Sequence, residues 1–326
     1  MKILGLGRYA LYSCVAAAML VGCGGSQPPI GAPGGIPQSR AIAAHSDRGG
    51  SWMAPERKKS DLLYIADVGT SDVYVYSYPN GTLMGTLTGF DQPHGECVDH
   101  AGDVFITNGA DDNIVEYAHG GTSPIATLSD TGYFPFGCSV DPTTGDLAVT
   151  NIERNGSRPG DVVIYKHAKG SPSGNYTDSK INYMYFCGYD NLGNLFVDGM
   201  NAGTASFGFA ELHSGGSSLK NIKLNEIIGL AGGVQWESTS IAVGDENAGS
   251  IYQFTIHGHK GTEVSYTQFQ DTDGIGEFWI QGGNVVAPDF GYHEVQFFKY
   301  PAGGSATKVI TGGLSAPFGA TISKAK

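Results

Sequence analysis

One short phrase recurs through most of this chain, and its spacing restricts the folds that the chain can adopt. The phrase places a small residue near the start of an apolar run, at Gly95, Gly137, Phe186 (a phenylalanine in the same place), Gly232, Gly276 and Gly319. The intervals are 42, 49, 46, 44 and 43 residues. Periods of this size are typical of arrays in which each repeat is one small structural unit. We therefore expect residues 60–323 to fold as one array.

The order of strands within the repeats predicts how the array closes. After each phrase but the last come two more apolar runs, for example "DVFITN" and "NIVEYAHGG" after Gly95. The array begins with "DLLYIAD" and "DVYVYSYPNG", which are second and third strands without a first, and it ends on the unfinished phrase "LSAPFGATIS". A C-terminal strand that completes the first unit would close a ring and remove the exposed sheet edge. The prediction is an all-β six-bladed β-propeller. An eight-stranded sandwich or jelly roll would leave the spacing unexplained.

The best-formed repeats, "PHGECVDHAGDVFITN" and "PFGCSVDPTTGDLAVTN", resemble those of NHL-repeat and SMP-30 (gluconolactonase-like) propellers. The resemblance extends over residues 61–323 and is looser around Gly232 and Gly276. It implies a fold more than a function, because propellers include hydrolases, lyases and binding scaffolds.

The first residues have the composition of an export signal. Lys2 and Arg8 precede the apolar run "ALYSCVAAAML", which is short for a membrane span, and "LVGC" ends at Cys23. This resembles the lipobox of bacterial lipoproteins and implies that residues 1–22 are removed and that Cys23 is lipidated. An ordinary secretory signal is the alternative. Residues 23–59, rich in Gly, Pro and Ser, are then a lipidated tether, and residues 324–326 a tail.

A lipid on Cys23 implies that the protein is anchored to a membrane of the cell envelope. Gly24 after the cysteine favours the outer membrane in a cell with two membranes. The formal net charge of −12 argues against a nucleic-acid partner, which would need a basic face.

Family chemistry would be expected at one mouth of the central channel. In the SMP-30-like lactonases, acidic or amide residues just before the repeat glycines hold a divalent metal. The residues in these places here are mostly hydrocarbon: His94, Phe136, Tyr185, Ala231, Ile275 and Phe318. Hard cations need several oxygen ligands, so we expect no metal and no cofactor. We interpret His94, Phe136, Tyr185 and Phe318 instead as an aromatic ligand-binding ring.

Polar residues end the second strand of several repeats and begin loops that face the same mouth: Asp67, Asn108, Asn151 and Asp198. Such residues often bind the amides of the following turn. Contact with a ligand is the alternative.

The function predicted from these features is binding or scaffolding through the channel mouth, with a small-molecule, glycan or protein ligand. The alternative is a hydrolase or lyase that acts on a lactone-like or glycan-derived ligand, with His94 and Glu96 as its acid–base pair. The chain contains no H-E-x-x-H, C-x-x-C, P-loop or G-x-S-x-G motif that would point to another chemistry.

Three cysteines lie in the repeats. Cys138 and Cys187 have the same register in neighbouring repeats, and Cys97 lies one place further on. Alternation of side chains along a strand then allows only Cys97 and Cys138 to face each other between blades. We favour three buried free thiols, with this pair as the alternative.

Overall fold

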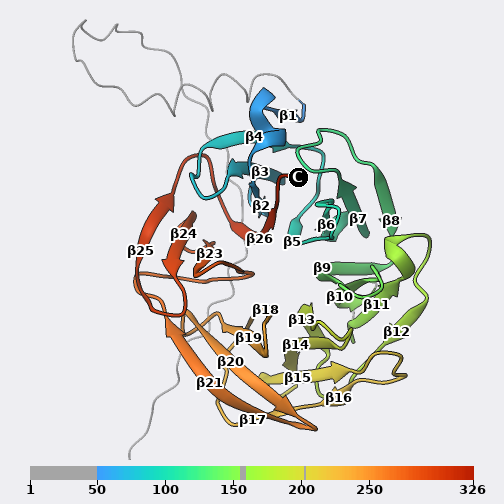
Figure 1. Ribbon diagram of the computed structural model, residues 1–326. Helices are drawn as coiled ribbons and strands as arrows, with labels where there is room; N and C mark the ends of the chain where they lie inside the picture. Colours follow the sequence, from blue (N-terminus) through green and yellow to red (C-terminus); the bar gives the residue numbers. More distant parts are fainter. Residues whose placement is uncertain (1–49, 155–158, 202) are drawn as a thin grey trace, which may run out of the picture. The chain divides into compact units, whose positions relative to one another are not determined.

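The fold is that of a six-bladed β-propeller. The computed structural model describes residues 50–154, 159–201 and 203–326, and within them the strands form six sheets. Figure 1 looks along the central axis, with β5, β9, β13, β18 and β26 near the centre and β8, β12, β16, β21 and β25 at the rim. The predicted fold class is confirmed. Within the described residues, no helix is long and apolar enough to cross a membrane.

The first three blades follow one another along the chain. Blade 1 contains β1 (Trp52–Met53), β2 (Leu62–Asp67), β3 (Asp72–Ser77), β4 (Leu83–Leu87) and β26 (Pro317–Ser323). Blade 2 contains β5 (Pro93–Val98), β6 (Val104–Asn108), β7 (Asn113–Tyr117) and β8 (Ala126–Ser129). Blade 3 contains β9 (Tyr133–Val140), β10 (Leu147–Arg154), β11 (Asp161–Tyr165) and β12 (Gly174–Tyr176). Short 3₁₀ helices precede β2, precede β7 and follow β11: η1 (Pro55–Lys59), η2 (Gly109–Asp111) and η3 (Lys166–Ala168).

The other three blades complete the ring. Blade 4 contains β13 (Tyr183–Tyr189), β14 (Leu195–Asn201), β15 (Ser206–Leu212) and β16 (Lys220–Asn221). Blade 5 contains β17 (Lys223–Leu224), β18 (Ala231–Glu237), β19 (Ser240–Asp245), β20 (Ser250–His257) and β21 (Lys260–Gln268). Blade 6 contains β22 (Trp279–Gln281), β23 (Asn284–Asp289), β24 (Glu294–Lys299) and β25 (Gly303–Ile310).

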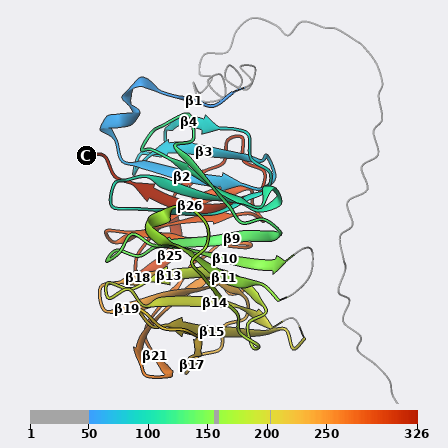
Figure 2. The same cartoon turned by 90° about the vertical axis from the view of Figure 1, so that its right-hand side faces the viewer.

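The last strand closes the ring as predicted. β26 pairs antiparallel with β2, with Leu62 opposite Ser323 and Ile65 opposite Ala320. The two strands lie side by side in both views (Figures 1 and 2). The carboxylate of Asp67 accepts hydrogen bonds from the amides of Ser315 (2.7 Å) and Ala316 (2.9 Å), which fixes the approach of β26. The first blade therefore joins both ends of the array.

Two blades have one strand more than the four expected. β1 pairs with β4, which places Trp52 opposite Thr86 at the outer edge of blade 1. β17 pairs in parallel with β21 at the outer edge of blade 5. Residues 52–59, at the end of the segment interpreted as a tether, thus form β1 and η1.

The repeated glycines are explained by the close approach of neighbouring inner strands. A Cβ atom on Gly95 would lie 2.5 Å from the carbonyl oxygen of Phe136, and one on Gly137 would lie 2.6 Å from that of Tyr185. A Cβ on Gly319 would collide with the carbonyl oxygen of His94. Each apolar core then forms between adjacent blades, as where Phe105 packs near Val149. These three glycines let the inner strands β26, β5, β9 and β13 lie close together around a narrow channel.

Candidate functional site

The predicted aromatic ring is a closed cluster at one end of the channel. The ring of Phe136 lies 4.6 Å from that of His94, 5.1 Å from Tyr185 and 5.2 Å from Phe318, measured between centroids. Phe186 joins the cluster at 5.4 Å from Phe136. Phe136 and Phe186 are buried, whereas Tyr185 and Phe318 are half-buried. The side chains pack on one another across the channel, and this end is filled.

His94 belongs to this cluster as a neutral side chain. Its Nδ1 donates a hydrogen bond of 2.8 Å to the carbonyl oxygen of Gln92. Burial lowers the pKa of His94 to about 4, because the charged imidazolium would lose its hydration among the aromatic rings. The imidazole is therefore uncharged near pH 7.

His94 and Glu96 do not form an acid–base pair in this structure. No hydrogen bond joins their described side chains, and the carboxyl group of Glu96 lies near the backbone of Ala66 and Thr321 in blade 1. Burial raises the pKa of Glu96 well above its usual value, and the nearby Glu277 raises it further. The two backbone groups offset part of this rise, but neither makes a hydrogen bond of normal geometry to the carboxylate. This arrangement does not favour the hydrolase or lyase alternative.

The column of polar side chains at the ends of the second strands forms hydrogen bonds with the neighbouring loops and strands. Asp67 accepts hydrogen bonds from Gly69 (2.9 Å) and Thr70 (3.1 Å), besides those from Ser315 and Ala316. The side-chain oxygen of Asn108 accepts one from Asp91, at 2.7 Å. Asn151 donates to Asp130 at 3.0 Å and to Asp161 at 2.8 Å. Asp67, Asn108 and Asn151 are all buried. They tie loops together, and their contact with a ligand stays a prediction.

Asp198 occupies a different register from the rest of this column. Its Oδ1 accepts from the amide of Phe186 at 2.9 Å, just as Thr107 and Thr150 accept from Gly95 and Gly137. The residue that follows it in β14, Gly199, takes the place of Asn108 and Asn151. Asp245 and Asp289, at the ends of β19 and β23, belong to the column instead and accept amides of Gly229 and Asp273. The alignment of Asp198 with Asn108 is therefore corrected by one residue.

The cysteine interpretation is corrected as well. Cys97 and Cys138 form a disulfide between blades 2 and 3, with their Cα atoms 5.7 Å apart. Cys187 is a buried free thiol. Alternation along the strands identified the right pair, but the distance between the inner strands decides whether the pair bonds. The glycine-mediated approach of β5 and β9 brings the two residues within disulfide range.

The opposite end of the channel contains a cavity of about 320 Å³. Five of the six inner strands line it, together with Glu277 and Phe278 just before β22: Glu96–Val98, Cys138–Val140, Cys187–Tyr189, Val234–Trp236 and Trp279. A second cavity of about 340 Å³ adjoins it and shares Val98, Val140, Pro142 and Trp279. The two cavities lie where the inner strands end.

Glu277 is the polar centre of this cavity. Its Oε2 accepts hydrogen bonds from the amides of Glu96 (2.9 Å) and Ala320 (3.1 Å), so one carboxyl group connects three inner-strand segments. Its Oε1 makes no hydrogen bond to the described residues, and the side chain is 8% exposed. Burial raises the pKa of Glu277 to about 8, against the opposing effect of the two amides.

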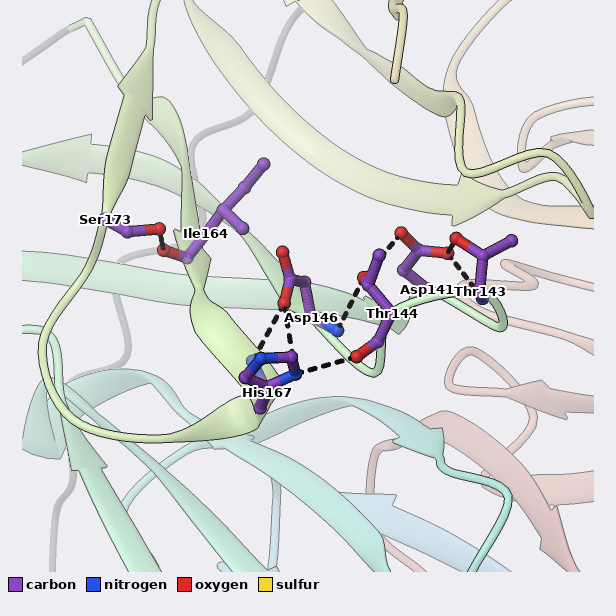
Figure 3. Close-up of polar contacts among 7 residues, drawn as sticks. All are labelled: Asp141, Thr143, Thr144, Asp146, Ile164, His167 and Ser173. Carbon is purple, nitrogen blue, oxygen red and sulfur yellow. Dashed lines mark hydrogen bonds and ion pairs between the residues drawn. The ribbon is translucent and has the colours of Figure 1, made fainter. Parts of the chain in front are cut away.

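An ordered turn lies beside the cavities at this end of the channel. In the turn after β9, the carboxylate of Asp141 accepts hydrogen bonds from the amide of Thr143 (2.8 Å) and the hydroxyl of Thr144 (2.7 Å) (Figure 3). His167 of η3 donates through Nδ1 to the carbonyl oxygen of Thr144 at 2.9 Å. The adjacent Pro142 lines both cavities. This part of the rim is therefore formed by the fold itself.

The repeat alignment did not point to this site, because it is one residue out of register in blade 6. Asp289 pairs with Ile275 as Asn108 pairs with Pro93, so Glu277 takes the place of Gly95 and Gly276 that of His94. Trp236 and Trp279, two of the three tryptophans in the chain, lie in the inner strands β18 and β22. Among residues 50–154, 159–201 and 203–326, no three His, Cys, Asp or Glu side chains gather in a way that would hold a metal ion.

Comparisons with known proteins support the fold. No protein-family model matches the chain, and no curated protein matches it. Among solved structures, a chain in the crystal structure of a nidogen/laminin complex aligns with a TM-score of 0.66 and 13% identity, over 82% of this chain and 99% of that one. A protein of unknown function from Bacteroides caccae aligns with a TM-score of 0.62 and 9% identity, over 81% and 98% of the two chains. Likeness at these identities shows the propeller fold alone.

Proposed function

We propose that this chain is an exported, lipid-anchored β-propeller that binds a small ligand in its central channel. The observation that carries the proposal is the cavity of about 320 Å³ beside Glu277, to which five inner strands contribute. Sites for small molecules are concave, largely apolar and preformed, with a few polar groups that fix orientation. The size of the cavity favours a small molecule over a protein segment as its occupant.

Two features support export and anchoring. The Cys97–Cys138 disulfide suits an oxidising compartment, because such bonds are rare in a reducing cytosol. The lipobox-like "LVGC" that ends at Cys23 lies outside the described residues, so the anchor rests on sequence alone. The repeats quoted above support placing the chain among NHL-repeat and SMP-30-like propellers, with the outer membrane as its location in a double-membraned cell.

The anchor is tested by changing Cys23→Ser in the full chain. Several acyl chains on one residue would hold the protein on a membrane, because each buried methylene contributes about 0.8 kcal/mol. We expect the wild type in the membrane fraction, labelled by radioactive fatty acid, and the variant unlabelled and released. Fatty-acid label on the Cys23→Ser protein would contradict the proposal.

The binding role is tested by native mass spectrometry of protein isolated from the membranes of its own cell. We expect a bound small molecule on the wild type and on Val264→Trp, a control on the exposed outer strand β21. Val140→Trp, which places an indole in the cavity wall, should carry none. A molecule retained equally by all three proteins would show that the channel is not the binding site.

A further inference from the structure

We propose that the ligand of the channel is a small organic cation, an amine with an apolar body, that pairs with Glu277 and lies against Trp236 and Trp279. The inference rests on the proposed binding function and gives it a ligand chemistry.

The first observation is an acceptor without a partner inside the cavity. Both backbone amides that reach Glu277 donate to Oε2, and Oε1 has no donor among the described residues. The side chain is more than nine-tenths buried and lines the cavity. A buried carboxylate without a full set of donors is costly, and an ammonium group supplies both the charge and the donors that it lacks.

The second observation is the sign of the charge around the cavity. Its described lining residues include the acids Glu96, Asp190 and Glu277, and none of them is Lys, Arg or His. Asp190 is already bonded to the amides of Leu192 and Asn194, each at 2.8 Å. When Glu277 is ionised, no cationic side chain lining this cavity supplies its counter-charge, and a bound cation would supply it. The nearest described cations, Lys324 and Lys326, line the adjoining cavity.

The third observation is aromatic surface in the wall of the same cavity. Trp236 of β18 and Trp279 of β22 are half-buried and line the cavity, and one face of Trp236 stacks on Phe196. A tryptophan face attracts a cation and also packs well on an apolar body. A bare metal ion fits less well, because it needs more oxygen ligands than Glu277 provides.

The titration state of the site makes binding depend on pH. Glu277 is mostly protonated at pH 7 because its pKa is raised to about 8. The titratable groups that interact with it are Glu96 of β5 and Cys187 of β13, and burial raises the pKa of both. A bound ammonium group stabilises the ionised carboxylate, so binding at pH 7 should release close to one proton. The affinity should rise up to about tenfold per pH unit below pH 8 and then level off.

The experiment is isothermal titration of the full-length lipoprotein with phenethylamine, 2-phenylethanol and phenylacetate, which share one apolar body. We expect binding of phenethylamine alone, with proton release measured in two buffers of different ionisation enthalpy. Glu277→Gln should weaken it at least tenfold, and the exposed control Glu56→Gln should not change it. If Glu277→Gln does not fold, Trp279→Leu and the proton release of the wild type decide the question.

Several results would overturn the inference. These are binding of 2-phenylethanol or phenylacetate as tight as that of phenethylamine, no binding of phenethylamine at millimolar concentration, or no proton release. A ligand of other chemistry that Val140→Trp displaces would overturn only the amine, and the proposed binding function would remain.

Discussion

At the scale of single residues, the repeat glycines could be predicted from the sequence, whereas the buried acid in the cavity could not. The glycines were predictable, because a small residue recurs at a fixed place and close backbone approach is the usual reason for one. Glu277 was not predicted, because the alternation of residues along a strand does not show which polar side chain faces the channel. Phe186 shows the same limit, since it replaces a repeat glycine and helps to fill the channel end.

The close approach at Gly137 leads to a stability prediction. A Cβ atom there would lie 2.6 Å from the carbonyl oxygen of Tyr185 and 3.0 Å from the Cα of Phe186. Gly137→Ala should therefore lower the free energy of unfolding by about 1–3 kcal/mol, as overpacking does. Gly50→Ala is the matched control, because a Cβ on Gly50 would meet nothing within 4 Å. Equal urea midpoints for the two variants would contradict the close approach.

The raised pKa of Glu277 predicts how stability depends on pH. Between the ordinary carboxyl pKa, about 4.3, and the folded value of about 8, the unfolded chain is ionised while folded Glu277 stays protonated. The folded state binds more protons in this window, so its stability falls as the pH rises, by up to about 1.4 kcal/mol per pH unit.

Glu277→Gln should remove most of that slope, because glutamine does not titrate and its oxygen can still accept both amides. Urea unfolding at pH 5, 6.5 and 8 measures the difference between the two proteins. Glu96 contributes in the same direction in both proteins, and less in the variant, because the charge of Glu277 raises the pKa of Glu96. Parallel stability curves would mean that Glu277 is not held protonated.

At the scale of elements, the order of the strands could be predicted from the sequence, but the packing of side chains at the two ends of the channel could not. The orphan strand "APFGATIS" predicted the pairing of β26 with β2, because only one edge in the ring lacked a partner. Which end of the channel is filled depends on aromatic side chains from β5, β9, β13 and β26. These contacts form only when the blades pack together, so an alignment of the repeats does not reveal them.

Removing residues 314–326 should open the ring. The deletion takes away β26 with the buried Ala320 and Ile322, exposes the edge of β2, and leaves Asp67 without two of its amide donors. Burying one side chain such as Ile322 is worth about 1.5–3 kcal/mol. Domains are stable by only about 5–15 kcal/mol, so we expect aggregation or unfolding.

Size-exclusion chromatography and thermal melting measure this loss, with removal of Lys326 alone as the control. A truncated protein that stays monomeric with an unchanged Tm would place the closure elsewhere.

At the scale of the whole molecule, the propeller has a channel that aromatic side chains fill at one end and that is hollow at the other. The number of blades and the closure could be predicted from the sequence. The resemblance of the repeats to SMP-30-like propellers directed attention to the other end of the channel, where the SMP-30-like lactonases bind a metal. The resemblance to NHL-repeat and SMP-30 propellers correctly predicted the fold, because the spacing of the repeats determines how the strands pair. It was less informative about the cavity, which is made by residues late in the inner strands, such as Val98, Val140 and Trp236.

The most direct test of this account is an experimental crystal structure of the protein isolated from the membranes of its own cell. We predict electron density for a small non-protein molecule beside Glu277 and Trp279, with His94, Phe136 and Phe318 packed together at the other end. Density for a ligand among those three aromatic side chains, with only water beside Glu277, would contradict the central claim.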